Sequence, residues 1–172
     1  MCRNLTVGVV SLCMFAAAAL AADDPFIGTW KANVAQSAFS PGPPPTSVTV
    51  TIAPHGTNGI HVTVEAMNAT GEKTVTHYSA NYDGKEYPFV QTGAGAVSGQ
   101  TISLKRMDAQ TVERTTYLAG KTLLTETWVV SQDGKTRTVT QTGTNAQGQA
   151  VNNIIVTEKQ AASRKFQPKS RY

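Results

Sequence analysis

From position 46 onward, the chain alternates between apolar and polar side chains in short runs separated by turn residues. In the run 46–52, Val48, Val50 and Ile52 fall on one face, and Ser47, Thr49 and Thr51 fall on the other. Alternation with a period of two predicts a half-buried β-strand. Further runs of this kind occupy 60–65, 73–82, 85–90, 100–107, 111–118, 121–131, 135–142 and 150–158. No stretch of helical length has the 3.6-residue periodicity of an amphipathic helix.

Short connections between these runs favour hairpins. Asp83–Gly84, Asp133–Gly134 and Gln147–Gly148 supply the glycine that a tight turn with positive φ requires. With 26–33 as the first strand, the chain has about ten strands in meander order. Closing such a sheet removes its unpaired edges. We therefore predict an all-β fold, an antiparallel up-and-down barrel of about 8–10 strands. A two-sheet sandwich is the alternative, because periodicity does not separate the two.

The turn at Asp133–Gly134 also predicts a register. A two-residue turn there places Trp128 opposite Val139 and Glu126 opposite Gln141. In the same way, a turn at Gln147–Gly148 would place Val139 opposite Val156 and Gln141 opposite Ile154. The expected inward apolar residues of these strands are Leu124, Trp128, Val130, Val139, Ile154 and Val156.

The first 21 residues have the three parts of a secretory signal peptide. Arg3 precedes an apolar stretch over 5–15, and an alanine-rich segment ends at Ala21, the expected cleavage site. The apolar stretch is too short to span a bilayer, so no transmembrane segment is predicted. We expect an exported protein, periplasmic or secreted. Cys2 and Cys13 both lie in this segment, so the mature chain would contain no disulfide and no thiol.

A Gly-x-Trp motif stands near the expected mature start, at Gly28 and Trp30. On a first strand that leads into a meander, it resembles the calycins, which include lipocalins and fatty-acid-binding proteins. With 24–30, 41–43, 148–153 and 158–160, the chain resembles a family of small exported bacterial proteins described as lipocalin-like. The resemblance implies that 22–158 form a barrel whose base holds Gly28 and Trp30.

The chain departs from the fatty-acid-binding proteins at two places. The prolines of 41–45 stand where those proteins have a helix pair. They are predicted to form a rigid extended spacer across one barrel end. The Arg-x-Tyr pair that holds a fatty-acid carboxylate aligns with Ile155 and Thr157. The resemblance therefore supports the barrel more than it supports fatty-acid binding.

Several polar residues lie on strands whose apolar residues are expected to face inward. Charges in a barrel interior are costly unless they are paired. Charged side chains that face inward should therefore pair with one another or bind a polar group of a ligand. One interpretation is an anionic or hydroxylated ligand held by Arg106 and Arg114, with Glu126 tuning both. The other is that several face solvent, because a one-residue slip reverses every face. The candidate ligand-binding residues are Arg106, Arg114, Glu126, Trp128, Gln141, His77 and Tyr82, and Arg137 shares this pattern.

The register of the strand 73–82 stays open. If Val62 lies opposite His77, then His77 faces inward, while Tyr78 and Tyr82 face outward. Neither a metal site nor a catalytic constellation is predicted, because no spacing supplies convergent ligands or a positioned nucleophile. The glycine-rich segment 93–99 is expected to be a loop at the barrel rim, because no helix follows it.

The net charge of +4 divides unevenly along the chain. It comprises +1 from Arg3, −2 from 22–158 and +5 from 159–172. The expected barrel therefore offers no basic face for nucleic acid, and the tail 159–172, predicted to be disordered, would touch anionic surfaces weakly. We expect a monomeric binding protein, not an enzyme and without a cofactor, that takes a small, largely apolar ligand in its lumen. The alternative is a filled barrel that binds another envelope protein.

Overall fold

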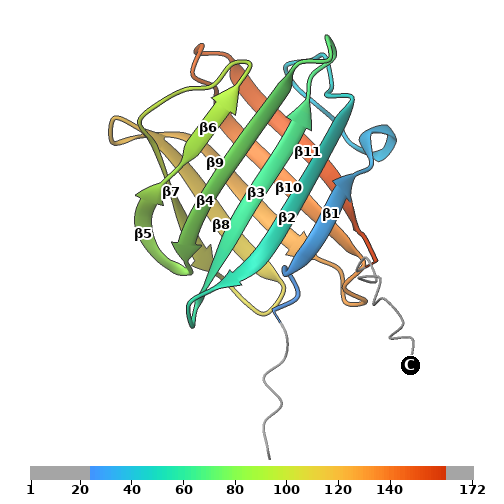
Figure 1. Cartoon of the computed structure of the whole chain (residues 1–172), viewed down its shortest axis with the longest axis vertical. Helices are drawn as coiled ribbons and strands as arrows, with labels where there is room; N and C mark the ends of the chain where they lie inside the picture. The colour runs from blue at the N-terminus through green and yellow to red at the C-terminus, as the bar shows by residue number, and fades with distance from the viewer. Residues whose placement is uncertain (1–23, 162–172) are drawn as a thin grey trace, which may run out of the picture.

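The computed structural model describes residues 24–161, which form one antiparallel sheet of eleven strands rolled into a barrel (Figure 1). The predicted signal peptide 1–21 and residues 162–172 of the predicted tail lie outside the described residues. The strands are β1 (Gly28–Ala32), β2 (Ser47–His55), β3 (Gly59–Met67), β4 (Lys73–Asn81), β5 (Asp83–Pro88), β6 (Val90–Gly93), β7 (Gln100–Arg106), β8 (Thr111–Leu118), β9 (Lys121–Val130), β10 (Thr136–Thr144) and β11 (Ala150–Lys159).

The sheet nearly closes on itself through β5 and β6. These strands stand at the two ends of the strand order, β5-β7-β8-β9-β10-β11-β1-β2-β3-β4-β6, yet they follow each other in the chain. β5 pairs with β7, and β6 pairs with β4. The segment 83–93 therefore joins the two edges of the sheet covalently. The predicted all-β antiparallel barrel is confirmed, and the two-sheet sandwich is excluded.

The hairpin predicted at Asp83–Gly84 does not form. Gly84 has a positive φ of 74°, and the pairing register shifts between Asp83 and Glu86. This irregularity directs the strand onto β7 instead of back along β4, as bulges commonly do. Two short strands, β5 and β6, thus form where the sequence predicted the single strand 85–90. The sheet therefore has eleven strands instead of about ten.

The predicted inward and outward residues alternate along the strands as buried and exposed residues. Along β9, Glu126, Trp128 and Val130 are buried, while Thr127 and Val129 between them are exposed. The predicted register of β9 and β10 is confirmed, with Trp128 opposite Val139 and Glu126 opposite Gln141.

The predicted register of β10 and β11 is wrong by one residue. Val139 lies opposite Ile155, not Val156, and Gln141 lies opposite Asn153, not Ile154. The side chain of Asn145 accepts hydrogen bonds from the amides of Gln147 and Gln149, at 3.1 and 2.9 Å, and this holds a three-residue loop over 146–148. The odd loop length reverses the faces of β11. Ile155 and Thr157 therefore face the lumen, and Ile154 is 46% exposed.

Trp30 lies fully buried near the end of the barrel where the chain enters β1. Its indole N–H donates to the carbonyl of Phe26 at 2.8 Å, and Phe26 is also fully buried. Gly28 has a φ of +133°, and a Cβ there would come within 2.8 Å of the Lys159 side chain. The Lys159 ammonium lies 5.1 Å from the centre of the Trp30 ring. Lys159 is the last residue of β11 and does not belong to the predicted tail.

The connection from β1 to β2 runs beside the barrel wall. It contains the 3₁₀ helix η1 (Val34–Gln36), after which Ala38 exchanges backbone hydrogen bonds with Ile154 of β11. Ser40 likewise accepts from the amide of Asn152 at 2.8 Å. The proline segment 41–45 thus leaves from the side of β11, and none of its residues lines the hollow at the barrel mouth described below. The predicted spacer across one barrel end stays a prediction.

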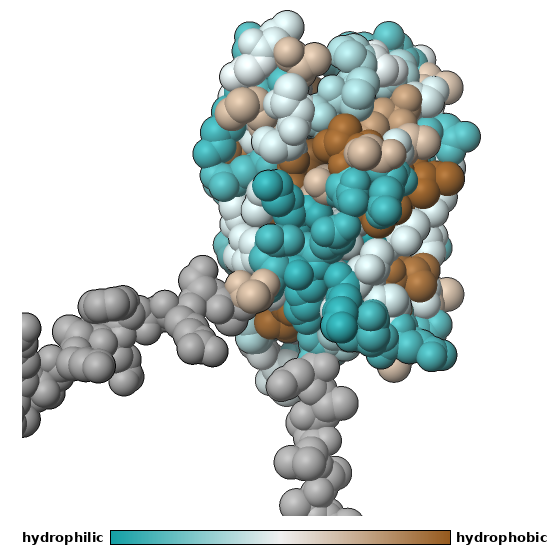
Figure 2. Space-filling view, turned by 90° about the vertical axis from the view of Figure 1, so that its right-hand side faces the viewer, coloured by the Kyte–Doolittle hydropathy of each residue, from teal (hydrophilic) through white to brown (hydrophobic). Residues whose placement is uncertain are grey.

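The outer surface is mainly polar. Figure 2 shows the right-hand side of the barrel of Figure 1, where hydrophilic residues separate small hydrophobic areas. The exposed large apolar side chains come from four different strands and one loop, and they are Met67, Val90, Met107, Val129 and Ile154. Within residues 24–161, no helix is long and apolar enough to cross a membrane.

Candidate functional site

A cavity of about 180 Å³ lies inside the barrel. Its apolar wall is formed by Val48, Val50, Val62, Val64, Trp128, Val139 and Ile155. Its polar residues are Tyr78, Arg114, Glu126, Arg137, Gln141 and Thr157. These side chains come from β2, β3, β4, β8, β9, β10 and β11, so the cavity exists only once the sheet has closed.

A second hollow of about 280 Å³ lies at the barrel mouth. It shares four residues with the cavity: Val64, Arg114, Glu126 and Gln141. Its rim includes Gly95 and Val97 of the glycine-rich loop and residues 145–147 of the loop between β10 and β11. The predicted rim position of the glycine-rich loop is confirmed. A polar cluster therefore stands where the cavity meets the mouth.

Glu126 is the centre of that cluster. Its carboxylate accepts from Arg114 Nη1 at 2.9 Å, from the indole N–H of Trp128 at 2.8 Å and from Gln141 Nε2 at 2.7 Å. Gln141 in turn accepts from Asn153 Nδ2 at 2.7 Å. Three donors satisfy most of the accepting capacity of one carboxylate, so this buried charge is well compensated.

Arg114 is the cationic partner of Glu126 and is itself almost buried. Its Nη2 donates to Thr116 Oγ1 at 2.9 Å, while its Nε has no partner among the described residues. Burial by itself lowers the pKa of a guanidinium, but the Glu126 carboxylate and Tyr78 outweigh that effect and raise the pKa of Arg114. The guanidinium of Arg114 therefore stays charged inside the barrel.

Arg137 lies deeper, between two tryptophans. Its guanidinium carbon is 5.2 Å from the ring centre of Trp30 and 5.1 Å from that of Trp128. Its Nε donates to Thr157 Oγ1 at 3.3 Å, and its Nη1 is buried without a partner among the described residues. Burial lowers the pKa of Arg137 to about 10. This value still leaves the group charged at neutral pH.

Tyr78 faces the cavity from β4, and its hydroxyl is buried without a partner in the described part of the chain. Burial raises its pKa to about 12. Because the folded-state pKa exceeds the unfolded value, the associated stability is fully present below about pH 10 and is lost as the pH rises through about 12.

An alkaline titration tests this position of Tyr78. At about pH 11, the phenolate absorbance of folded Tyr78→Phe is expected to equal that of the unchanged protein, because Tyr78 is still protonated there. In denaturant at the same pH, the variant should show less phenolate. A loss of phenolate in the folded variant would mean that the Tyr78 hydroxyl is open to water.

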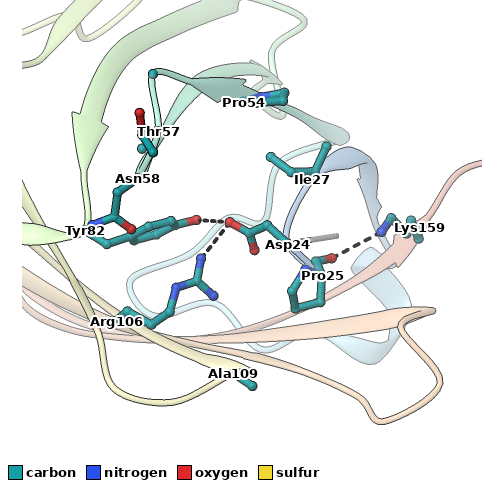
Figure 3. A pocket seen from close by; sticks show the side chains of 12 residues that line it. Asp24, Pro25, Ile27, Pro54, Thr57, Asn58, Tyr82, Arg106, Ala109 and Lys159 are labelled. Carbon is teal, nitrogen blue, oxygen red and sulfur yellow. Dashed lines mark hydrogen bonds and ion pairs between the residues drawn. The ribbon is translucent and has the colours of Figure 1, made fainter. Parts of the chain in front are cut away.

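Arg106 and Tyr82 lie together beside Asp24 (Figure 3). They line a different hollow from Arg114, which lines the cavity and the hollow at the mouth. Asp24 Oδ2 accepts from Arg106 Nη2 at 2.6 Å and from the Tyr82 hydroxyl at 2.9 Å. The guanidinium carbon of Arg106 also lies 3.9 Å from the centre of the Tyr82 ring. Burial, with Asp24 beside it, raises the pKa of Tyr82. These contacts attach the start of the barrel to β7 and to the residue between β4 and β5, beside an open basin of about 910 Å³.

His77 lies on the outer face of the barrel, because Val62 pairs with Tyr78 instead of with His77. Val62 and Tyr78 therefore face inward, and both are buried. A neighbouring histidine on the same outer face, His61, has its Nδ1 2.9 Å from Ser79 Oγ. Among residues 24–161, no three His, Cys, Asp or Glu side chains are placed to hold a metal ion.

The structure thus brings together Arg114, Glu126, Trp128 and Gln141 and separates them from Arg106, Tyr82 and His77. Sequence reasoning placed Arg137 among inward charges but missed Tyr78, whose direction depends on the register of β3 with β4. It also missed Asp24, since nothing in the sequence signals a contact with residues 58 and 82 positions away.

Comparison with known proteins adds no functional assignment. No protein-family model matches the chain, and no curated protein matches it in sequence.

Proposed function

We propose that this protein is an exported, lipocalin-like binding protein, not an enzyme, that takes a small and largely apolar molecule into its lumen. The observation that carries the proposal is the cavity of about 180 Å³, walled by valine, isoleucine and tryptophan and edged by a few polar groups. Ligand sites in proteins have this composition, since apolar walls supply the free energy of desolvation and a few polar groups fix orientation.

The size of the cavity limits the ligand. At about 180 Å³ it lies below the ~300–1,000 Å³ typical of pockets for drug-sized molecules. A short aliphatic chain or a single substituted ring fits this volume better than a long lipid. A longer molecule would have to extend past Arg114 and Gln141 into the hollow at the mouth.

The exposed surface gives less support to the alternative, a filled barrel that binds an envelope protein. Its large apolar side chains come from four different strands and one loop, and single exposed apolar residues are normal on soluble domains. Protein-binding surfaces are usually contiguous patches. The lumen is therefore the better candidate.

Ligand binding is tested with the purified protein and a panel of small aliphatic and aromatic molecules. We expect a member of the panel to change the tryptophan fluorescence, because Trp128 lines the cavity. It should also raise the melting temperature, since a ligand that binds only the folded state stabilises it.

Two variants locate the binding. Val64→Phe places a larger side chain where the cavity meets the mouth and should abolish both responses. Val129→Phe makes the same change on the outer face, where Val129 is 44% exposed, and should leave both intact. If no member of the panel produces either response, or if Val64→Phe responds as well as Val129→Phe, the lumen is not the binding site.

Export is tested separately. The protein expressed with its full N-terminus should be recovered from a periplasmic or secreted fraction, and its measured mass should correspond to a chain beginning at Ala22. Recovery of the uncleaved chain in the cytoplasm would contradict export.

A further inference from the structure

Two of the three histidines of the chain lie together on the outer wall of the barrel, where β3 and β4 run side by side (Figure 1). His61 of β3 pairs with Ser79 of β4. Two residues along each strand, Thr63 pairs with His77. His61 and His77 are therefore diagonal neighbours on one face of the sheet. The Cβ atoms of such neighbours lie within roughly 8 Å of each other, which is within reach of long side chains.

Both histidines line one hollow of about 330 Å³ on this outer face. The hollow lies where β4 has no further strand beside it. β6 pairs with β4 only as far as His77, which lies opposite Val90, and β5 pairs with β7 instead. The residues that line the hollow are His61, His77, Tyr78, Ser79, Pro88 and Val90. None of these residues carries a carboxylate, an ammonium or a guanidinium group, so the two imidazoles are its main polar groups.

The ring of His61 is oriented by its neighbour across the strands. Its Nδ1 lies 2.9 Å from Ser79 Oγ. In the tautomer that donates this hydrogen bond from Nδ1, the lone pair of the imidazole is on Nε2. Histidines that bind metal ions are usually oriented by such a hydrogen bond from the other ring nitrogen. His61 is also exposed, so an ion can reach its side chain from solvent.

A pair of imidazoles without carboxylates favours one class of metal ion. Mg²⁺ and Ca²⁺ prefer oxygen ligands, above all carboxylates. Imidazole suits Cu²⁺, Ni²⁺ and Zn²⁺, and Cu²⁺ generally binds a given site most tightly among these three. Water would fill the other coordination positions, because within residues 24–161 no three His, Cys, Asp or Glu side chains are placed to hold a metal ion.

We propose that His61 and His77 bind a divalent transition-metal ion on the outer wall of the barrel, Cu²⁺ more tightly than Ni²⁺ or Zn²⁺, with Ser79 as a positioning residue for His61. The site lies outside the lumen and does not depend on the proposed ligand function. Sequence spacing did not reveal it, because the pairing of β3 with β4 decides the face of His77. With Val62 opposite His77, the two histidines would lie on opposite faces of the wall.

Metal binding is tested by calorimetric titration of the purified, untagged protein at neutral pH with CuSO₄, NiCl₂, ZnCl₂ and MgCl₂. We expect one Cu²⁺ ion per chain, weaker binding of Ni²⁺ and Zn²⁺, and no binding of Mg²⁺. Electron paramagnetic resonance of the Cu²⁺ complex should detect the nitrogens of two imidazoles. A complex without imidazole nitrogens would overturn the proposal.

Substitutions assign the ligands. Ser79→Ala keeps both imidazoles and should weaken Cu²⁺ binding by about tenfold, whereas Ser79→Thr keeps the hydroxyl and should bind as the unchanged protein does. His61→Gln and His77→Gln each remove a ligand and should weaken binding by more than Ser79→Ala does. His55→Gln is the matched control, because His55 does not line the hollow, and it should leave binding unchanged.

Melting temperatures separate the loss of the site from a loss of the fold. Without metal, each histidine variant should melt as the unchanged protein does, because these side chains are exposed or half-buried. Zn²⁺ should raise the melting temperature of the unchanged protein and of His55→Gln, but not that of His77→Gln, since the site exists only when β3 and β4 are paired.

Two results would overturn the metal site and leave the proposed function of the lumen unaffected. One is full Cu²⁺ affinity in the double variant His61→Gln with His77→Gln, which would place the ion elsewhere, for example at the terminal amine. The other is a loss of affinity in His55→Gln equal to the loss in His61→Gln, which would mean that any exposed histidine binds the ion.

Discussion

Replacing Glu126 by leucine is expected to lower the free energy of unfolding by about 3–5 kcal/mol. Glu126 is 6% exposed, and its carboxylate accepts hydrogen bonds from Arg114, Trp128 and Gln141. Leucine would leave the buried guanidinium of Arg114 without its counter-ion. Its neighbour in the cavity wall, Arg137, takes part in no ion pair among the described residues. Removing one partner of a buried ion pair costs far more than the pair contributes by its presence.

Urea denaturation measures this loss, and two further variants interpret it. Glu65→Leu removes the carboxylate of a pair whose side chains are 49% and 52% exposed, and should cost less than about 1 kcal/mol. The double variant Glu126→Leu with Arg114→Met should recover much of the loss, because it removes both charges. If Glu126→Leu costs no more than Glu65→Leu, the carboxylate does not neutralise a buried charge.

Trp30→Ala is expected to cost about 3–5 kcal/mol of unfolding free energy. The indole is fully buried, its N–H is bonded to the Phe26 carbonyl, and the cations of Arg137 and Lys159 lie 5.2 and 5.1 Å from its ring. Alanine would leave a cavity near the end of the barrel where β1 begins and deprive Arg137 of one of its aromatic neighbours.

Guanidinium denaturation of three variants tests the role of Trp30. Trp30→Phe keeps most of the ring volume and loses the hydrogen bond, so its loss should be intermediate. Val129→Ala, on the exposed face of β9, should lie within about 0.5 kcal/mol of the unchanged protein. A midpoint for Trp30→Ala equal to that of Val129→Ala would exclude Trp30 from the core.

The local turn signal was sufficient to predict the register of one hairpin but not that of the next. The turn at Asp133–Gly134 sets the register of β9 and β10, and the Asp133 carboxylate accepts from the Lys135 amide within the same turn. The loop after β10 misled the prediction, because the side chain of Asn145 holds a loop one residue longer than Gln147–Gly148 suggests. That single residue moved Ile154 to the outside and Ile155 and Thr157 to the lumen.

The interpretation that places Arg106 and Arg114 on the inner face agrees with the structure, but alternation did not indicate their place along the barrel. Arg106 and Arg114 both lie on the inner side of their strands, as their spacing from apolar neighbours indicates. The structure nevertheless places Arg106 with Asp24 and Tyr82 at one end, and Arg114 with Glu126 next to the mouth. The height of a residue in a barrel depends on the pairing of every intervening strand, which periodicity does not contain.

The sequence by itself determined the all-β fold, most of its strands and the inward direction of Trp128, Val130 and Val139, because a period of two is a property of consecutive residues. Only the tertiary structure decided how the barrel closes through 83–93, that a cavity remains, and which buried charge has no ion-pair partner among the described residues. These features depend on side chains brought together from seven strands. The volume left between those side chains, and the partner of each buried charge, are fixed only when the strands are paired.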